Sequence, residues 1–152
     1  TKPGSRDHHL IQNIDYAETF LEIASAKIPG DMQGRSLVPL LKGQSPKNWR
    51  TSIYYHYYEY PSFHMVPRHY GIRTERYKLM HFYRFGNEWE MYDLQKDPDE
   101  LTNLYGQPGQ AKLTADLKKQ LYALQKHYGD DSDLSEMPKE WKDKVRPGTA
   151  QK

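Results

Sequence analysis

The strongest constraint on the fold is the alternation of aromatic and polar residues through the middle of the chain. In the first such stretch, Tyr55 and Tyr57 fall on one side of an extended backbone, and Tyr54 and His56 fall on the other. Similar stretches follow at short intervals, with turn residues between them. The predicted strands are residues 51–60, 69–74, 77–84 and 89–94. Their order and short connections predict a four-stranded antiparallel meander.

A leucine repeat after the strands predicts a helix over residues 110–128. Leu117, Leu121 and Leu124 recur at helical spacing, and Gly129 suits the position after the last helical residue. The leucine side of this helix is expected to cover one face of the sheet. The predicted fold class is therefore α+β: a small four-stranded antiparallel sheet packed against a C-terminal helix.

Residues 16–26 form another predicted helix, near the start of the chain. Asp15 is a suitable N-cap, and Glu18 follows three residues later, as in a capping box. The apolar positions that share one side of this helix are Ala17, Phe20, Leu21 and Ala24.

A third, shorter helix is predicted over residues 98–105. Asp97 can accept from the first free N–H groups, and Pro98 suits the first helical position. Glu100 stands where a capping box places its second side chain.

The charge balance argues against nucleic acid and anionic membranes as partners. The chain has 22 Lys and Arg residues against 20 Asp and Glu residues, a formal net charge of +2. It has no cysteine, which excludes disulfides, thiolate zinc sites and cysteine nucleophiles. No apolar run approaches the roughly 18 residues of a membrane span. The first residues contain no secretory apolar segment, and the chain starts as though cut from a longer protein.

No complete catalytic or metal-binding set can be assembled from the sequence. The seven histidines form no His-Glu-x-x-His pattern and are interpreted as surface or pocket-edge residues. No serine lies in a Gly-x-Ser-x-Gly elbow. Paired carboxylates such as Asp130 and Asp131 stand in turns, where structural roles suffice. We therefore expect neither a catalytic residue nor a metal ligand in this chain.

The loop of residues 60–70 is the best candidate for ligand binding. Arg68 can hold a sulfate or carboxylate through two hydrogen bonds, and His64 and His69 can donate to the same oxygens. Its aromatic rings suit a sugar ring. The alternative is a structural loop anchored by Phe63 and its apolar neighbours, with Arg68 paired to a carboxylate. Both interpretations remain open, because loops on a rigid sheet often carry binding groups.

Two motifs, read together, resemble the C-terminal region of formylglycine-dependent sulfatases, the family of arylsulfatases and sulfated-glycan sulfatases. They are Gly71-Ile-Arg-Thr and the Asp-Pro-x-Glu-x-x-Asn-Leu sequence that begins at Asp97. Residues 13–24 are similar to the last helix of the sulfatase catalytic domain, and residues 31–43 are similar to the crossing into the smaller C-terminal subdomain. That family usually has proline where this chain has Glu18.

The resemblance implies the C-terminal fragment of a bacterial sulfatase that acts on sulfated carbohydrates, where it completes the fold and shapes the substrate pocket. The family's formylglycine arises from a Cys/Ser-x-Pro-x-Arg motif, which this sequence lacks, and its calcium is held by upstream acidic residues. Both cofactors are expected only in the catalytic domain, and this chain alone is expected to be inactive. Substrate contacts are carried over to His64, Arg68 and His69. The resemblance also implies a periplasmic or secreted enzyme.

The implied organisation is residues 1–48 as the remnant of an α/β catalytic domain and the crossover, residues 49–129 as the C-terminal subdomain, and residues 130–152 as a polar tail. In the tail, Trp141 is the one large anchor. Without the catalytic domain, apolar residues of the first segment lose their cover, so we expect the isolated chain to self-associate. These residues are Phe20, Leu21, Ile23, Leu40 and Leu41.

Two other functions remain as alternatives. The tyrosine-rich strand allows an independent carbohydrate-binding module, whose glycan binding would be lost in Tyr57→Ala and kept in Arg68→Ala. A nucleic-acid binder is disfavoured by the near-neutral charge, and steeply salt-dependent RNA binding would support it.

Overall fold

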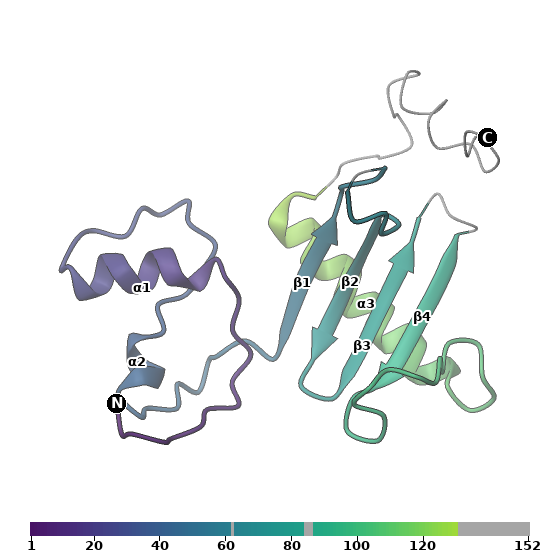
Figure 1. Ribbon diagram of the computed structural model, residues 1–152, viewed down its shortest axis with the longest axis horizontal. Helices are drawn as coiled ribbons and strands as arrows, with labels where there is room; N and C mark the ends of the chain where they lie inside the picture. Colours follow the sequence, from purple (N-terminus) through teal and green to yellow (C-terminus); the bar gives the residue numbers. More distant parts are fainter. Residues whose placement is uncertain (62, 84–86, 131–152) are drawn as a thin grey trace. The chain divides into compact units, whose positions relative to one another are not determined.

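The computed structural model describes residues 1–61, 63–83 and 87–130. They belong to two compact units, Thr1–Ile53 and Tyr54–Lys152 (Figure 1). The predicted polar tail falls, apart from Asp130, outside the described residues.

The first unit contains two short helices, α1 (Asp15–Ile23) and α2 (Val38–Leu41). Helix α1 ends at Ile23 rather than at residue 26, because Ser25 takes a left-handed backbone conformation with φ 54°. Its buried positions are Asp15, Glu18 and Thr19. Phe20 and Ile23, in contrast, are 67% and 64% exposed. The helix is thus polar on its buried side and apolar on its exposed side.

Asp15 is not the N-cap of α1, contrary to the prediction. The N-cap is Ile14, and no side chain caps the helix. The Asp15 carboxylate is fully buried and accepts two hydrogen bonds from the Arg50 guanidinium. It also accepts from the backbone N–H groups of Gln12 (2.7 Å) and Arg35 (2.8 Å). Burial opposes ionisation, but these hydrogen bonds outweigh it and hold the pKa of Asp15 below its ordinary value.

The second unit is built on the predicted four-stranded sheet, in the order β1-β2-β3-β4. The strands are β1 (Ser52–Tyr57), β2 (His69–Thr74), β3 (Tyr77–Phe82) and β4 (Glu88–Asp93). Successive strands run in opposite directions (Figure 1). Ile72 lies opposite Leu79, which in turn lies opposite Met91, so this register gathers apolar side chains on one face. The predicted antiparallel meander is confirmed.

The turn between β2 and β3 forms without the glycine that tight hairpins favour. The Thr74 hydroxyl accepts from the Tyr77 N–H (2.8 Å) and donates to the Tyr77 carbonyl (3.1 Å). These two bonds close the turn around Glu75 and Arg76 and fix the register of the hairpin.

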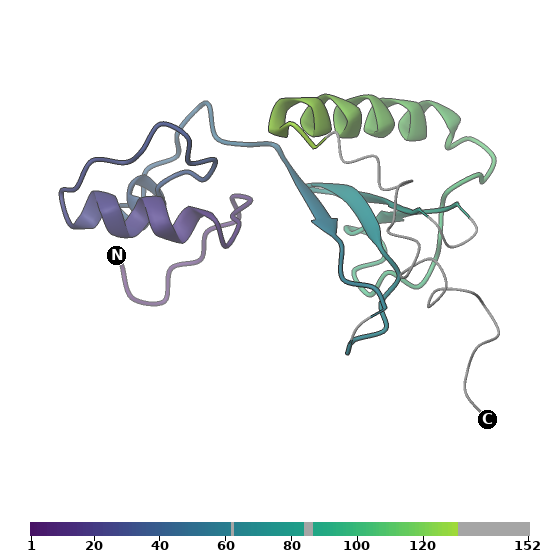
Figure 2. The ribbon, with the colours of Figure 1, turned by 90° about the horizontal axis from the view of Figure 1, so that it is seen from above.

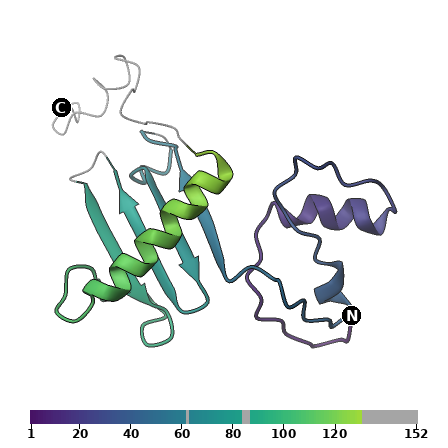
Figure 3. The same ribbon diagram turned by 180° about the vertical axis from the view of Figure 1, so that it is seen from behind.

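Helix α3 (Ala111–Tyr128) covers one face of the sheet and crosses it diagonally (Figures 2 and 3). Leu117 and Leu121 are almost fully buried between helix and sheet, where they form the core with Ile72, Leu79 and Met91. Gly129 ends the helix with φ 64°, as predicted. The covering helix predicted from the leucine spacing is confirmed.

The helix predicted over residues 98–105 is absent, and this stretch is a series of turns. Asp97 does accept from backbone N–H groups, but from those of Leu101 (3.1 Å) and Thr102 (2.8 Å). The stretch leads to Asn103, whose side-chain oxygen accepts from the Met91 N–H (3.0 Å). Leu104 then donates its backbone N–H to the Met91 carbonyl (2.8 Å).

These contacts explain why the capping signal does not produce a helix. The chain satisfies its backbone groups on the free edge of β4, which would otherwise remain open to pairing with another strand. Glu100, predicted to complete a capping box, has φ 56° and instead binds the Lys78 ammonium (2.6 Å).

We predict that Leu121→Ala lowers the free energy of unfolding by about 2–5 kcal/mol, the cost of a cavity between α3 and the sheet. Leu121 is fully buried, whereas Leu101 is 83% exposed and offers a matched control. Urea denaturation should find Leu101→Ala within about 0.5 kcal/mol of the parent chain. Equal losses in both variants would contradict the assigned core.

Candidate functional site

The loop between β1 and β2 carries the three residues predicted to bind substrate. His64 lies exposed on the loop, next to Met65, whose φ is 50°. Arg68 directly precedes β2 and is half-buried, and His69 is the first residue of that strand. The three predicted residues therefore differ in surroundings: His64 is exposed, whereas Arg68 and His69 are half-buried at the start of β2.

His69 belongs to the sheet face that α3 leaves uncovered. Its ring stacks on Tyr57 at 5.5 Å between centroids and lies 5.1 Å from the Phe82 ring. The Nδ1 atom donates to the Pro67 carbonyl (2.8 Å), because a carbonyl oxygen can only accept. In the neutral ring, Nε2 then remains as an acceptor, and on protonation it becomes a donor.

Burial is the main cause that lowers the pKa of His56, and the positive charge of Arg68 acts in the same direction. His56 belongs to the helix-covered side, where its ring contacts Tyr70.

A hydrogen-bonded group of four half-buried residues, here called the His56 cluster, lies beside the loop. Its members are Tyr54, His56, Tyr83 and Asp130. The His56 Nδ1 atom donates to Asp130 Oδ2 (2.6 Å), and Nε2 accepts from the Tyr83 hydroxyl (2.7 Å). The Tyr54 hydroxyl donates to the same Asp130 oxygen. Both ring nitrogens of His56 are thus hydrogen-bonded, and its side chain is only 5% exposed.

The interpretation of His56 as a surface residue is wrong, because its side chain is only 5% exposed. One signal in the sequence was its position on the same side of β1 as Tyr54, which packs against the core. Nothing in the sequence indicated that Asp130 binds His56, because the two residues are 74 positions apart in the chain. Burial lowers the pKa of His56, although the hydrogen bond and charge of Asp130 act in the opposite direction.

A second buried histidine repeats this arrangement on β3. His81 Nε2 lies 2.5 Å from the Asn87 side-chain oxygen, and Nδ1 lies 2.8 Å from the Tyr70 hydroxyl. The ring stacks on Trp89 at 4.2 Å between centroids. The Lys118 ammonium lies 3.9 Å from the centre of the Trp89 ring. Burial lowers the pKa of His81 as well.

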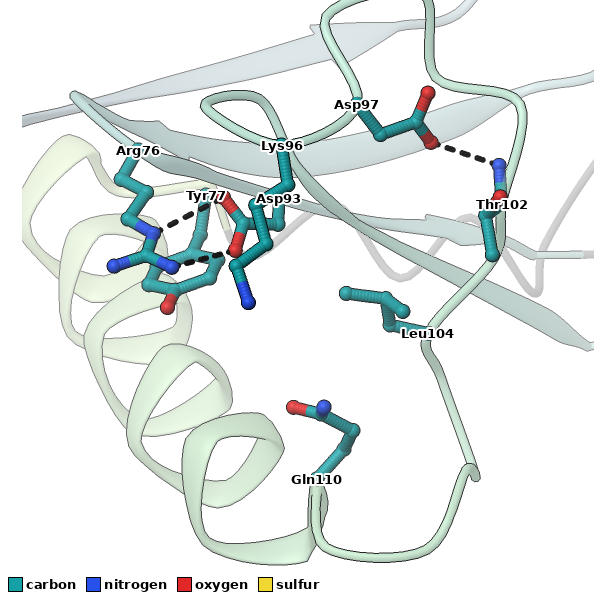
Figure 4. A pocket seen from close by; sticks show the side chains of 8 residues that line it. All are labelled: Arg76, Tyr77, Asp93, Lys96, Asp97, Thr102, Leu104 and Gln110. Carbon is teal, nitrogen blue, oxygen red and sulfur yellow. Dashed lines mark hydrogen bonds and ion pairs between the residues drawn. The ribbon is translucent and has the colours of Figure 1, made fainter.

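A pocket opens at the other end of the sheet, around the β2–β3 turn (Figure 4). Its main cation, Arg76, is held by Asp93 through two hydrogen bonds of 3.0 and 2.7 Å. The Arg76 hydrogen bonds hold the pKa of Asp93 below its ordinary value, so the carboxylate stays charged and matched to the guanidinium. A sulfate or carboxylate ligand would have to displace Asp93, which makes this pocket a poor anion site.

The described part of the chain contains no group of three or more His, Asp or Glu side chains placed to hold a metal ion. No helix in that part is both long and apolar enough to cross a bilayer.

The fold and site together define a class: an α+β domain with an antiparallel sheet covered by a helix on one face, and a loop that carries aromatic residues, His64 and Arg68. Residues 1–127 match the family described as N-sulphoglucosamine sulphohydrolase, C-terminal. The chain therefore belongs to this family of sulfatase C-terminal regions.

Individual relatives agree with this assignment. The chain is 48% identical to N-acetylglucosamine-6-O-sulfatase of Bacteroides thetaiotaomicron over 86% of its own length and 24% of that protein. It is 34% identical to Delta 4,5-hexuronate-2-O-sulfatase of the same organism, over 72% of its length and 23% of the relative. A solved protein in complex with its substrate, D-glucosamine-2-N,6-O-disulfate, matches with a TM-score of 0.74 and 48% identity, over 78% of this chain and 24% of that one. The chain spans about a quarter of each.

We predict that His56 and His81 remain mostly neutral at about pH 6.5, where an ordinary histidine is half protonated, because burial lowers both pKa values. The unfolded chain then binds more protons than the folded chain, so the free energy of unfolding decreases as the pH falls below about 6.5. Ring-nitrogen NMR should follow each titration.

Urea denaturation at about pH 7.5 and pH 5.5 should show a smaller difference in the double variant His56→Phe, His81→Phe than in the parent chain. Titration of both rings at the ordinary value would contradict the prediction.

Proposed function

We propose that the chain is the C-terminal part of a sulfatase that hydrolyses sulfate esters of carbohydrates. The observation that carries this proposal is the 48% identity to N-acetylglucosamine-6-O-sulfatase, across sheet, loop and covering helix. The similar solved protein binds a disulfated glucosamine as substrate, which supports a sulfated sugar as the ligand class. We assign residues 1–48 to the end of the catalytic domain, residues 49–129 to the C-terminal subdomain and residues 130–152 to a polar tail.

The chemistry of S–O bond cleavage is assigned to the remaining three-quarters of the enzyme. The sequence has no Cys/Ser-x-Pro-x-Arg motif from which a formylglycine could form. Formylglycine and calcium therefore belong to the part of the enzyme outside this chain. Export to the periplasm or the medium is proposed with the same family assignment.

The role of the first unit is to complete the larger domain. Helix α1 buries Asp15, Glu18 and Thr19 and exposes Tyr16, Phe20 and Ile23, the reverse of a surface helix. An exposed apolar surface of this kind usually marks a contact with another part of a protein. We propose that the preceding part of the sulfatase packs on it.

The isolated chain should therefore self-associate through α1. Sedimentation velocity should show dimers or larger species at high concentration, and Phe20→Lys combined with Ile23→Lys should shift them towards monomer. Leu101→Lys, at a residue that is 83% exposed in the second unit, serves as the control and should change little. A clean monomer at high concentration would count against the proposed cover.

The role of the second unit is to supply contacts to the sugar and its sulfate from the β1–β2 loop. We propose His64, Arg68 and His69 as these contacts, with Arg68 as the main anion-binding group. A stand-alone sugar-binding module on β1 is not favoured, because Tyr54 packs against the core and Tyr55 lies across Gly71.

A chimaera tests the function directly. Joined to the preceding part of the Bacteroides N-acetylglucosamine-6-O-sulfatase, the chain should restore desulfation of a sulfated glucosamine, whereas the chain alone should not turn over an aryl sulfate. Arg68→Ala in the chimaera should raise KM about tenfold or more, because a charged hydrogen-bonding group is lost.

Arg73→Ala is the matched control, since Arg73 is an exposed arginine of β2, the strand that Arg68 directly precedes, and it should leave KM unchanged. Circular dichroism should show that both variants fold. Robust desulfation by the chain alone would overturn the proposal that the catalytic groups lie outside this chain. An unchanged KM in Arg68→Ala would remove this residue from the substrate contacts.

A further inference from the structure

The His56 cluster joins three elements around one imidazole. His56 belongs to β1, Tyr83 directly follows β3, and Asp130 follows the end of α3. The place of Asp130 is set by the helix end, where its N–H donates to the Gln125 carbonyl (3.0 Å) after the left-handed Gly129. The side chains of His56 and Asp130 are 5% and 10% exposed, so the contact is almost dry.

The same imidazole touches both ends of the β1–β2 loop. Its ring stacks on Tyr58, the residue directly after β1, at 3.8 Å between centroids. It also meets the edge of Tyr70, the second residue of β2, at 5.7 Å. A change in the orientation of the ring would therefore move both the entry and the exit of the loop that carries Arg68.

Hydrogen bonds at both ring nitrogens permit one orientation of the His56 ring. An apolar ring of the same size would fill the space but would remove the hydrogen bonds that His56 makes with the Tyr83 hydroxyl and Asp130. The cluster therefore fixes the orientation of the His56 ring in addition to filling space.

We propose that His56 and Asp130 are positioning residues for substrate binding: they fix the β1–β2 loop against the end of α3 and so set the place of Arg68 and His69. This inference rests on the proposed function of the loop. Neither residue touches the substrate, because His56 is enclosed and both of its ring nitrogens are occupied.

The first test concerns the loop alone and uses the 152-residue chain. In Asp130→Ala, backbone order parameters from ¹⁵N relaxation at Tyr60, Arg68 and His69 should fall from about 0.85 to below about 0.6. Asp130→Asn keeps a side-chain oxygen acceptor and should stay close to the parent chain. Asp116→Ala, at an exposed carboxylate within α3, is the matched control and should change nothing.

The order parameters of the loop residues decide whether the inference holds. Unchanged order parameters in Asp130→Ala would overturn it. So would an equal loss of order in the buried strand β3, because that would mean general destabilisation rather than release of the loop.

The second test uses the chimaera described above and separates this inference from the proposed function. His56→Phe and Asp130→Ala should raise KM for the sulfated sugar about tenfold, with kcat for a small aryl sulfate unchanged, and Asp130→Asn should recover most of the loss. A mobile loop with unchanged KM would show that the cluster fixes the loop, but it would overturn the inferred role in substrate binding and remove the loop from the substrate site. A rigid loop in Asp130→Ala would overturn the positioning role whatever the kinetics.

Discussion

Burial of Leu117 and Leu121 against the sheet is the contact on which the second unit depends. A four-stranded meander has two faces, and this chain has too few large aliphatic residues to bury both of them. One helix laid across Ile72, Leu79 and Met91 supplies a core of five almost fully buried side chains. Tyrosine and tryptophan rings then extend that core outwards, which is why the helix-covered face carries hydrogen-bonded hydroxyl groups rather than only hydrocarbon.

The parts of the fold that the sequence predicted are those with a local cause. Alternation along each strand and the leucine spacing of α3 both follow from the geometry of a single element, and the glycine after Tyr128 ends that helix for a local steric reason. The predictions that failed involve side chains with distant partners. The sequence predicts Asp15 as an N-cap, but in the structure its carboxylate binds Arg50. Residues 98–105 are predicted as a helix, but Asn103 and Leu104 instead hydrogen-bond to the free edge of β4.

The candidate site shows the same division. The aromatic and basic composition of the β1–β2 loop is visible in the sequence, and the structure places that loop at the end of the sheet away from the Arg76 pocket. The His56 cluster could not be predicted, because it joins β1 to a carboxylate 74 residues later and to a hydroxyl 27 residues later. Such contacts depend on how the helix crosses the sheet, and periodicity does not reveal the crossing angle.

Three cationic side chains of the described residues are each held by a carboxylate. The Arg50 guanidinium is bound to Asp15, the Arg76 guanidinium to Asp93 and the Lys78 ammonium to Glu100. These pairs cancel their own fields, so each adds little attraction for a sulfate group at a distance. The His56 cluster differs from these pairs, because burial lowers the pKa of His56 while Asp130 accepts hydrogen bonds from both His56 and Tyr54. A neutral imidazole keeps these hydrogen bonds directional without adding a buried positive charge.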